Sequence, residues 1–241
     1  MKILISGGNG KFSKELQNHN YGFELIPLSK TEMDITDLNS IRSAIKNYNP
    51  DVLIHAAALS RPMAIHDSNP DKSIQLNIIG TSNCVLACME HDIKLVYIST
   101  DFVYPGKEGN YTEYSPVYPI NKYAWSKLGG ECAVMLYDKT LILRLAMIED
   151  LFPHKKAFID SFKSCIWMSE AAKITLNLIK QNCFGVYNIG GERKSIYDFV
   201  KQKNFYILKE SKNNINEHVP YDISMDVTKL KTIINTYDTT I

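Results

Sequence analysis

The sequence lacks the features of disulfide-rich, zinc-binding, nucleic-acid-binding and membrane proteins. Its five cysteines form no C-x-x-C pair, which argues against both a disulfide framework and a zinc site. The net charge is only +1, so no overall field attracts nucleic acid or an anionic membrane. No apolar stretch approaches the roughly 20 residues of a membrane helix. The chain also enters an apolar run at Lys2 without a signal peptide. We therefore expect a cytoplasmic protein with no metal site and no nucleic-acid or membrane partner.

The order of the apolar segments indicates an α/β fold. The 241 residues contain no internal repeat, and short apolar runs alternate with helical patterns. Such alternation predicts a doubly wound parallel sheet with helices on both faces. The expected strands are 2–6, 23–28, 52–55, 95–99, 141–144 and 186–189, and two long helices are expected at 71–91 and 122–137.

Tyr123 and Lys127 are four positions apart in the second of these helices, which puts a phenol and an ammonium on one helix face. A nearby positive charge favours the phenolate and lowers the pKa of a tyrosine from its usual value of about 10. Such a tyrosine can exchange a proton with a carbonyl or an alcohol. The spacing alone does not decide this, because it also occurs by chance in solvated helices.

A glycine-rich turn follows the first expected strand. The turn contains Gly7, Gly8 and Gly10, and a helical pattern begins directly after it. Strand, glycine turn and helix together form the unit that binds the pyrophosphate of a dinucleotide in doubly wound folds. The run at 95–99 ends in Ser99 and Thr100, and ligands in such sheets lie beyond the carboxyl ends of the strands. These hydroxyls either face a bound ligand or simply end the strand with local backbone hydrogen bonds.

Together these segments resemble the extended short-chain dehydrogenase/reductase superfamily and, within it, the dTDP-4-dehydrorhamnose reductase family. The likeness is carried by segments 7–10, 33–37, 51–58, 99–104, 123–131 and 224–230, and it is thinnest between 145 and 172. It implies a Rossmann sheet with a small C-terminal substrate lobe. We expect a dinucleotide-binding domain at 1–145 and an interleaved substrate lobe at 146–241, with 185–190 returning to the main sheet.

The resemblance also implies the site residues. Tyr123 would donate the proton. Lys127 would lower the pKa of Tyr123 and bind the nicotinamide ribose, and Thr100 would polarise the substrate carbonyl. The residues expected to bind the cofactor are Gly7, Asn9, Gly10, Lys11, Phe12, Ser29, Lys30, Asp34, Ile35, Ala56, Ala57, Ala58, Asn77, Ser99, Tyr123 and Lys127. Those expected to contact the substrate are Thr100, Asp101, Phe102, Tyr123 and Arg193. Other candidate cations for the substrate pyrophosphate are Arg144, Lys155, Lys156 and Lys194.

The chain departs from the family pattern in three places. Ser13 stands where the family has the third glycine of its loop. Leu145, Ala146 and Met147 follow Arg144, where the family often has an aromatic residue, and the segment between Arg144 and Glu170 is short. The cofactor half of the resemblance therefore carries over better than the substrate half.

The residues after the second expected strand bear on the choice of cofactor. Chains that prefer NAD usually have an acid there, to bind the ribose 2′-hydroxyl. Here Ser29 and Lys30 follow instead. Lys30 and Lys11 of the glycine turn could bind a 2′-phosphate. Alternatively, both lysines are simply exposed to solvent, as lysines usually are. We expect NADPH, with NADH possible.

The expected activity is reduction of a dTDP- or UDP-linked 4-keto-6-deoxyhexose to a rhamnose-type or acetamido-deoxyhexose sugar nucleotide. Two alternatives remain. One is a sugar-nucleotide epimerase or dehydratase, although Asp101 has no Glu beside it as a dehydratase would need. The other is a regulatory subunit that binds NADP without turnover. A homodimer through the helices at 71–91 and 122–137 is also possible.

Overall fold

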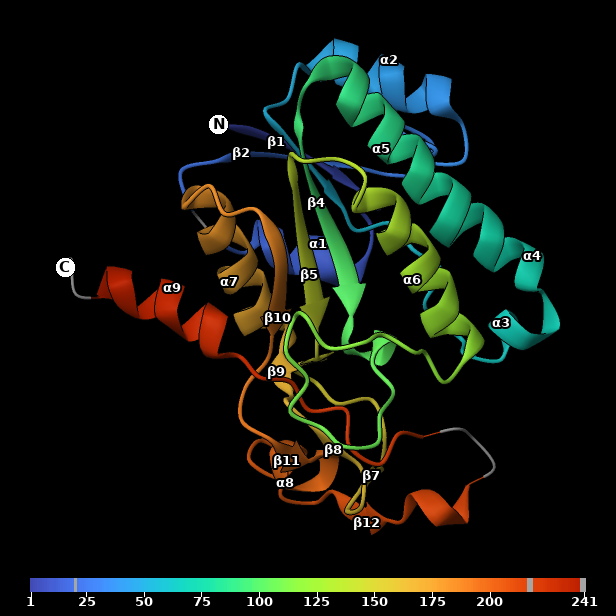
Figure 1. Cartoon of the computed structure of the whole chain (residues 1–241), viewed down its shortest axis with the longest axis vertical. Helices are drawn as coiled ribbons and strands as arrows, with labels where there is room; N and C mark the ends of the chain where they lie inside the picture. Colours follow the sequence, from blue (N-terminus) through green and yellow to red (C-terminus); the bar gives the residue numbers. More distant parts are fainter. Residues whose placement is uncertain (20, 216–218, 239–241) are drawn as a thin grey trace. The chain divides into compact units, whose positions relative to one another are not determined.

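The chain forms two compact units in a computed structural model that describes residues 1–19, 21–215 and 219–238 (Figure 1). The first unit holds residues 1–99, 122–143 and 172–186, and the second holds 100–121, 144–171 and 187–241. Residues 100–121 belong to the second unit because Tyr111 bonds to its C-terminal segment. Tyr111 N donates to Ser224 O at 3.0 Å, and Asp226 N donates to Tyr111 O at 2.9 Å. The expected division near residue 145 into a cofactor domain and a substrate lobe stays a prediction.

Six parallel strands form the central sheet and confirm the predicted doubly wound fold. They are β1 (Lys2–Ser6), β2 (Glu24–Leu28), β3 (Val52–His55), β4 (Lys94–Thr100), β5 (Thr140–Leu145) and β10 (Gly185–Ile189). Their order in the sheet is β10-β5-β4-β3-β1-β2. The order reverses between β1 and β3, and ligands of open α/β sheets bind beyond the strand ends at such a switch point.

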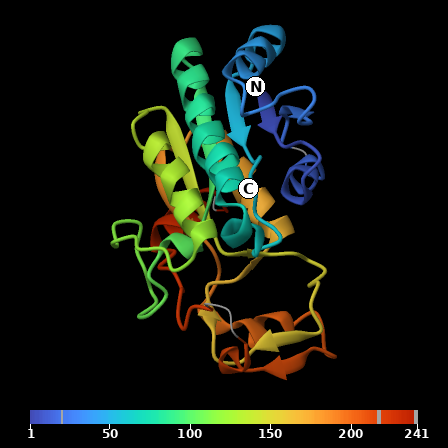
Figure 2. The same cartoon turned by 90° about the vertical axis from the view of Figure 1, so that its right-hand side faces the viewer.

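Helices cover both faces of this sheet (Figures 1 and 2). On one face lie α2 (Leu38–Tyr48), α5 (Gly80–His91) and α6 (Lys122–Val134), and on the other lie α1 (Lys11–Gln17) and α7 (Met168–Lys180). The helix expected at 71–91 is made of α4 (Pro70–Ser73), the π-helical turn η1 (Ile74–Ile79) and α5, and it follows the short α3 (Ile65–Ser68). None of the helices in the described residues has both the length and the apolar composition to cross a bilayer.

The core of the first unit lies between the sheet and these helices. Leu4, Leu53 and Leu95 from neighbouring strands are completely buried, as are Cys84 and Cys88 of α5. Burying one such leucine side chain stabilises the fold by roughly 1.5–3 kcal/mol. This packing fixes the strand ends and the helix faces that carry the site.

The second unit consists of short elements. Among its described residues, three pairs of short strands are present: β6 (Met147–Ile148) with β9 (Ile166–Trp167), β7 (Lys156–Phe158) with β12 (Leu208–Glu210), and β8 (Phe162–Lys163) with β11 (Lys194–Ser195). Its helices are η2 (Asp101–Val103), α8 (Ile196–Val200), η3 (Lys212–Asn214) and α9 (Thr228–Asp238). Trp167, Phe199 and Val200 lie in a separate small core.

Candidate active site

The predicted Tyr–Lys pair lies on α6, where Lys127 is buried and Tyr123 is partly exposed. The Lys127 side chain is 3% exposed, and its Nζ lies 4.1 Å from the ring centroid of Tyr97 on β4. The Tyr97 hydroxyl donates a hydrogen bond to the Lys127 carbonyl at 2.9 Å. The ring of Tyr123 lies against that of His66, with the centroids 5.2 Å apart. Thus α6 carries a partly exposed tyrosine one turn before a buried lysine.

Burial controls the charge of Lys127. Removing an ammonium from water disfavours its charged form, and burial lowers the pKa of Lys127 to about 7. The negative charge of Glu131, one turn further along α6, works against this lowering. Lys127 therefore changes charge near neutral pH, as groups at functional sites often do.

Asn77 of η1 fastens α6 to the loop that follows β3. The Asn77 amide donates to Leu59 O at 2.9 Å and to Ser126 Oγ at 2.8 Å, and it accepts from Leu59 N at 2.8 Å. The Ser126 hydroxyl in turn donates to the Tyr123 carbonyl at 2.7 Å. Gly130 makes the close approach possible, because a Cβ there would lie 2.5 Å from Asn77 O. Asn77 thus positions α6, and its contact with a cofactor stays a prediction.

The glycine-rich loop leaves no room for side chains at the switch point of the sheet. Gly7 has φ +69°, and a Cβ there would lie 2.8 Å from the Cα of Ala57. A Cβ on Gly8 would lie 2.7 Å from the backbone of β2, and Gly10 begins α1 without a capping side chain. Ser13, in the place of the third glycine, is 1% exposed and donates its hydroxyl to Gly7 O at 2.8 Å. This departure therefore closes the loop instead of disrupting it, and the loop fits a bound dinucleotide.

A buried histidine, which the sequence analysis did not single out, supports the same edge of the sheet. His55 Nδ1 lies 2.8 Å from Ser6 Oγ, and Nε2 lies 3.0 Å from Thr81 Oγ1. Because the Thr81 hydroxyl donates to Asn77 O at 2.8 Å, it accepts from Nε2, and Nδ1 accepts from Ser6. The Ser6 oxygen also accepts from Ala57 N at 3.1 Å. Burial lowers the pKa of His55 to about 3, so the ring is neutral.

An acidic side chain lies at the end of β2, contrary to the prediction. We expected no acid there, but the backbone turns back after Ser29, with Glu32 N donating to Ser29 O at 3.2 Å. The Glu32 carboxylate accepts from Ser29 N at 2.8 Å and from Ser29 Oγ at 2.6 Å. Lys30 is 75% exposed and pairs with Asp34 at 3.7 Å. The expectation of a missing acid was wrong, because a four-residue turn brings one to the strand end.

In the second unit, the residues after β4 form a buried polar cluster. The Thr100 hydroxyl donates to Asp101 at 3.2 Å and accepts from Phe102 N at 3.3 Å, so it caps η2. Asp101 pairs with Lys163 at 2.9 Å, and Lys163 Nζ lies 4.7 Å from the Phe102 ring centroid. Burial raises the pKa of Asp101, and Lys163 opposes the rise. Thr100 is thus held by its own turn.

The two arginines proposed for the substrate pyrophosphate lie in different settings within this unit. Arg144 is 6% exposed and donates to the Tyr104 hydroxyl at 2.8 Å, which in turn donates to Asn188 at 2.7 Å. Its burial makes it a poor anion receptor. Arg193 is 49% exposed and pairs with Asp222 at 2.6 Å. Arg193 therefore remains a candidate for contact with the substrate.

Comparison with known proteins identifies the family. The sequence profile of the RmlD substrate binding domain family matches residues 1–229. The chain belongs to this family.

The sequence relatives match this chain over only part of their own length. Methionine adenosyltransferase 2 subunit beta of Rattus norvegicus is 32% identical over 143 residues, which are 56% of this chain and 42% of that protein. The dTDP-4-dehydrorhamnose reductase of Aggregatibacter actinomycetemcomitans is 30% identical over 148 residues, 59% of this chain and 50% of the relative. The chain thus spans half or less of the length of these relatives.

A solved structure of the same fold is the dTDP-4-dehydrorhamnose reductase of Bacillus anthracis in complex with NADP. It has a TM-score of 0.86 and 24% identity, over 96% of this chain and 92% of that one. At this identity the likeness supports the Rossmann fold.

The predicted site residues of this RmlD-family chain fall into two groups. Asn9, Gly10 and Lys11 are exposed in the glycine loop, and Ala58 is exposed after β3, so a cofactor can reach them. The side chains of Phe12, Ile35 and Ser99 are buried, at 7%, 4% and 4% exposed. Any contact of Phe12 and Ile35 with a cofactor therefore runs through their backbone. The cofactor and substrate roles of all these residues stay predictions.

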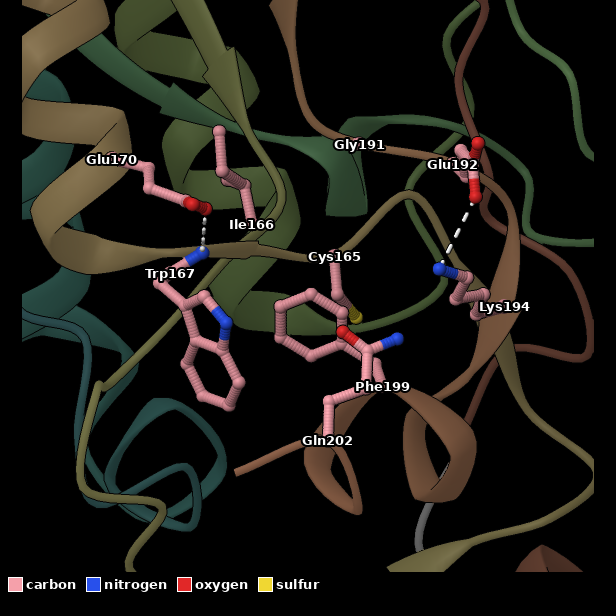
Figure 3. A pocket seen from close by; sticks show the side chains of 9 residues that line it. All are labelled: Cys165, Ile166, Trp167, Glu170, Gly191, Glu192, Lys194, Phe199 and Gln202. Atoms are coloured by element: carbon pink, nitrogen blue, oxygen red, sulfur yellow. Dashed lines mark hydrogen bonds and ion pairs between the residues drawn. The ribbon is translucent and has the colours of Figure 1, made fainter. Parts of the chain in front are cut away.

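Among the predicted site residues, the candidate cation Lys194 lines a pocket of about 240 Å³ in the second unit (Figure 3). The rings of Trp167 and Phe199, with centroids 4.4 Å apart, form part of its wall. The Glu170 carboxylate accepts from Trp167 N at 3.4 Å, and Lys194 pairs with Glu192 at 3.1 Å (Figure 3). With Lys194 paired and two carboxylates on the wall, this pocket is unsuited to a pyrophosphate.

Proposed function

We propose that this chain is an NADPH-dependent reductase of a dTDP- or UDP-linked 4-keto-6-deoxyhexose. The observation that carries the proposal is the partly exposed Tyr123 one turn before the buried Lys127, in a unit that also has the glycine loop of a dinucleotide site. Membership of the RmlD family and the reductase named among its relatives support it. The product would be a rhamnose-type or acetamido-deoxyhexose sugar nucleotide.

The residues that would hold the cofactor lie along the switch point. The backbone at Gly7 and Gly10 would face the pyrophosphate, Ala57 would line the groove, and Lys127 would bind the nicotinamide ribose. When bound, NADPH supplies a hydride to the keto carbon. Lys30 favours the 2′-phosphate of NADPH, whereas Glu32 at the same strand end suits the 2′-hydroxyl of NADH. NADH use is therefore possible.

The protein's own part is to supply and direct a proton. Tyr123 would donate its phenolic proton to the carbonyl oxygen, and the Lys127 ammonium would stabilise the phenolate that remains. The Thr100 hydroxyl would hold the same oxygen. General acid catalysis of this kind contributes roughly 10²–10⁴-fold to the rate. Asp101, Phe102 and Arg193 would contact the substrate.

A second candidate function is a regulatory subunit that binds NADP without turnover. It is favoured by the match to a protein named as subunit beta of methionine adenosyltransferase 2. An epimerase or dehydratase, which consumes no cofactor overall, is the other alternative. The retained Tyr123 and Lys127 favour catalysis over a purely regulatory role.

Location and assembly form part of the proposal. Five free cysteines suit the reducing cytoplasm. Leu86, Met89 and Trp125, on α5 and α6, are each about half exposed, at 48%, 47% and 48%. They support a homodimer through these helices, and a monomer in analytical ultracentrifugation would refute it.

The activity is tested by NADPH oxidation with a panel of dTDP- and UDP-4-keto-6-deoxyhexoses. The proposal predicts consumption that depends on one sugar nucleotide. Tight NADPH binding without consumption would transfer support to the regulatory and epimerase alternatives.

A further inference from the structure

Glu131 is a buried carboxylate on α6, one turn beyond Lys127. Its side chain is 2% exposed, and one oxygen accepts a hydrogen bond from the Ser99 hydroxyl at 2.6 Å. Ser99, on β4, is 4% exposed. Residues four apart on a helix share one face, so Glu131 lies on the same face as Lys127 and Tyr123.

The groups from β3 and β4 that surround the Lys127 ammonium are neutral. From β4 it faces the ring of Tyr97, whose own pKa is raised by burial, so the phenol is neutral. From β3 it acts on His55, which is neutral as well. On α6 its neighbours are Tyr123 and Glu131, and the negative charge is that of Glu131. A buried ammonium without an opposite charge is strongly destabilising and tends to lose its proton.

The hydrogen bond from Ser99 holds this carboxylate in place. Bonds from a hydroxyl to a carboxylate are short and stronger than those between neutral groups, and 2.6 Å is in their usual range. Because Ser99 lies on β4 and Glu131 lies on α6, the bond also ties the helix to the strand that ends at Thr100.

We propose that Glu131 is a positioning residue, held by Ser99, that keeps the Lys127 ammonium charged and in place for the reaction. The inference rests on the proposed function, in which Lys127 binds the nicotinamide ribose and supports Tyr123 as a charged group. Ser99 then acts through Glu131.

The first test follows the dissociation constant of NADPH as a function of pH for the wild type and Glu131→Gln. Glutamine keeps the shape and an oxygen for Ser99 but removes the charge. NADPH binding should weaken as Lys127 loses its proton, and losing the carboxylate should move this inflection to lower pH by about one unit or more. Asp138→Asn, which removes an exposed carboxylate beyond the end of α6, should leave the inflection in place. An unmoved inflection in folded Glu131→Gln would overturn the proposal.

The second test needs no cofactor, and it remains informative if Glu131→Gln is less stable than the wild type. Thermal unfolding is compared for Glu131→Gln, Lys127→Met and the double variant. If the two charges attract each other, each single variant removes that attraction from the buried charge that remains. The double variant should then lose much less in melting temperature than the sum of the single losses. Additive losses would overturn the pairing. Absence of NADPH binding in the wild type would refute the proposed function instead, and the unfolding comparison would still decide the role of Glu131.

Discussion

His55 should make the first unit sensitive to mild acid. In the folded chain, burial lowers its pKa to about 3, whereas an unfolded histidine has a pKa of about 6.5. Between these values the unfolded chain binds a proton that the folded chain does not. Folding stability therefore falls as the pH drops below about 6.5 and continues to fall until about pH 3.

The size of the effect follows from the two pKa values. At pH 5 the gap of about 1.5 units below the unfolded pKa corresponds to a loss of about 2 kcal/mol. For a chain of this size that loss lowers the melting temperature by roughly 4–8 °C relative to pH 7. Lys127, whose pKa is about 7 when folded, adds a slope of the same sign that is confined to the upper end of this range and to higher pH. Carboxylates with lowered pKa values, such as Asp34, act mainly below about pH 4.

The assay is thermal unfolding at half-unit steps between pH 5 and pH 7. His55→Gln, which can still hydrogen-bond Ser6 and Thr81, should lose most of the dependence in this window. His66, whose pKa is also lowered by burial, leaves a residual slope of the same sign. His91→Gln, at an exposed position, should retain the full dependence. An equal slope in wild type and His55→Gln would refute the reasoning.

Two further predictions concern the glycine-rich loop and the turn after β2. Gly7→Ala should cost more stability than Gly22→Ala, because both positions have φ near +70° but only at Gly7 does a Cβ meet another backbone, that of Ala57. The strained φ alone costs about 1 kcal/mol, and equal melting temperatures of the two variants would argue against the close contact. Glu32→Gln should raise the preference for NADPH over NADH severalfold, because it removes a negative charge beside Ser29. Dissociation constants for both cofactors measure this, and an unchanged ratio would place the 2′-group elsewhere.

The local patterns of the sequence were sufficient to predict the central sheet and the helix that carries Tyr123 and Lys127. The strand at Val52–His55 was predicted at its observed bounds, since an apolar run between turns is a short-range signal. The spacing of Tyr123 and Lys127 is set by helix geometry alone, so their common face was predictable too.

Features that depend on contacts between distant segments were not predictable. Ser6 meets His55 across 49 residues, and β7 pairs with β12 although about 50 residues separate them. Strands of two or three residues carry too little periodicity to be found from sequence. The small strands of the second unit, which the family resemblance covers least, were therefore missed.

The most direct test of the proposed reductase is the absorbance of NADPH with purified protein and each sugar nucleotide of the panel, for the wild type and Tyr123→Phe. Phenylalanine keeps the ring that lies against His66 but removes the proton donor. The proposal predicts oxidation with one 4-keto-6-deoxyhexose, reduced at least 100-fold in Tyr123→Phe, with NADPH binding retained. Oxidation that continues unchanged in Tyr123→Phe, or no oxidation with any member of the panel despite NADPH binding, would contradict it.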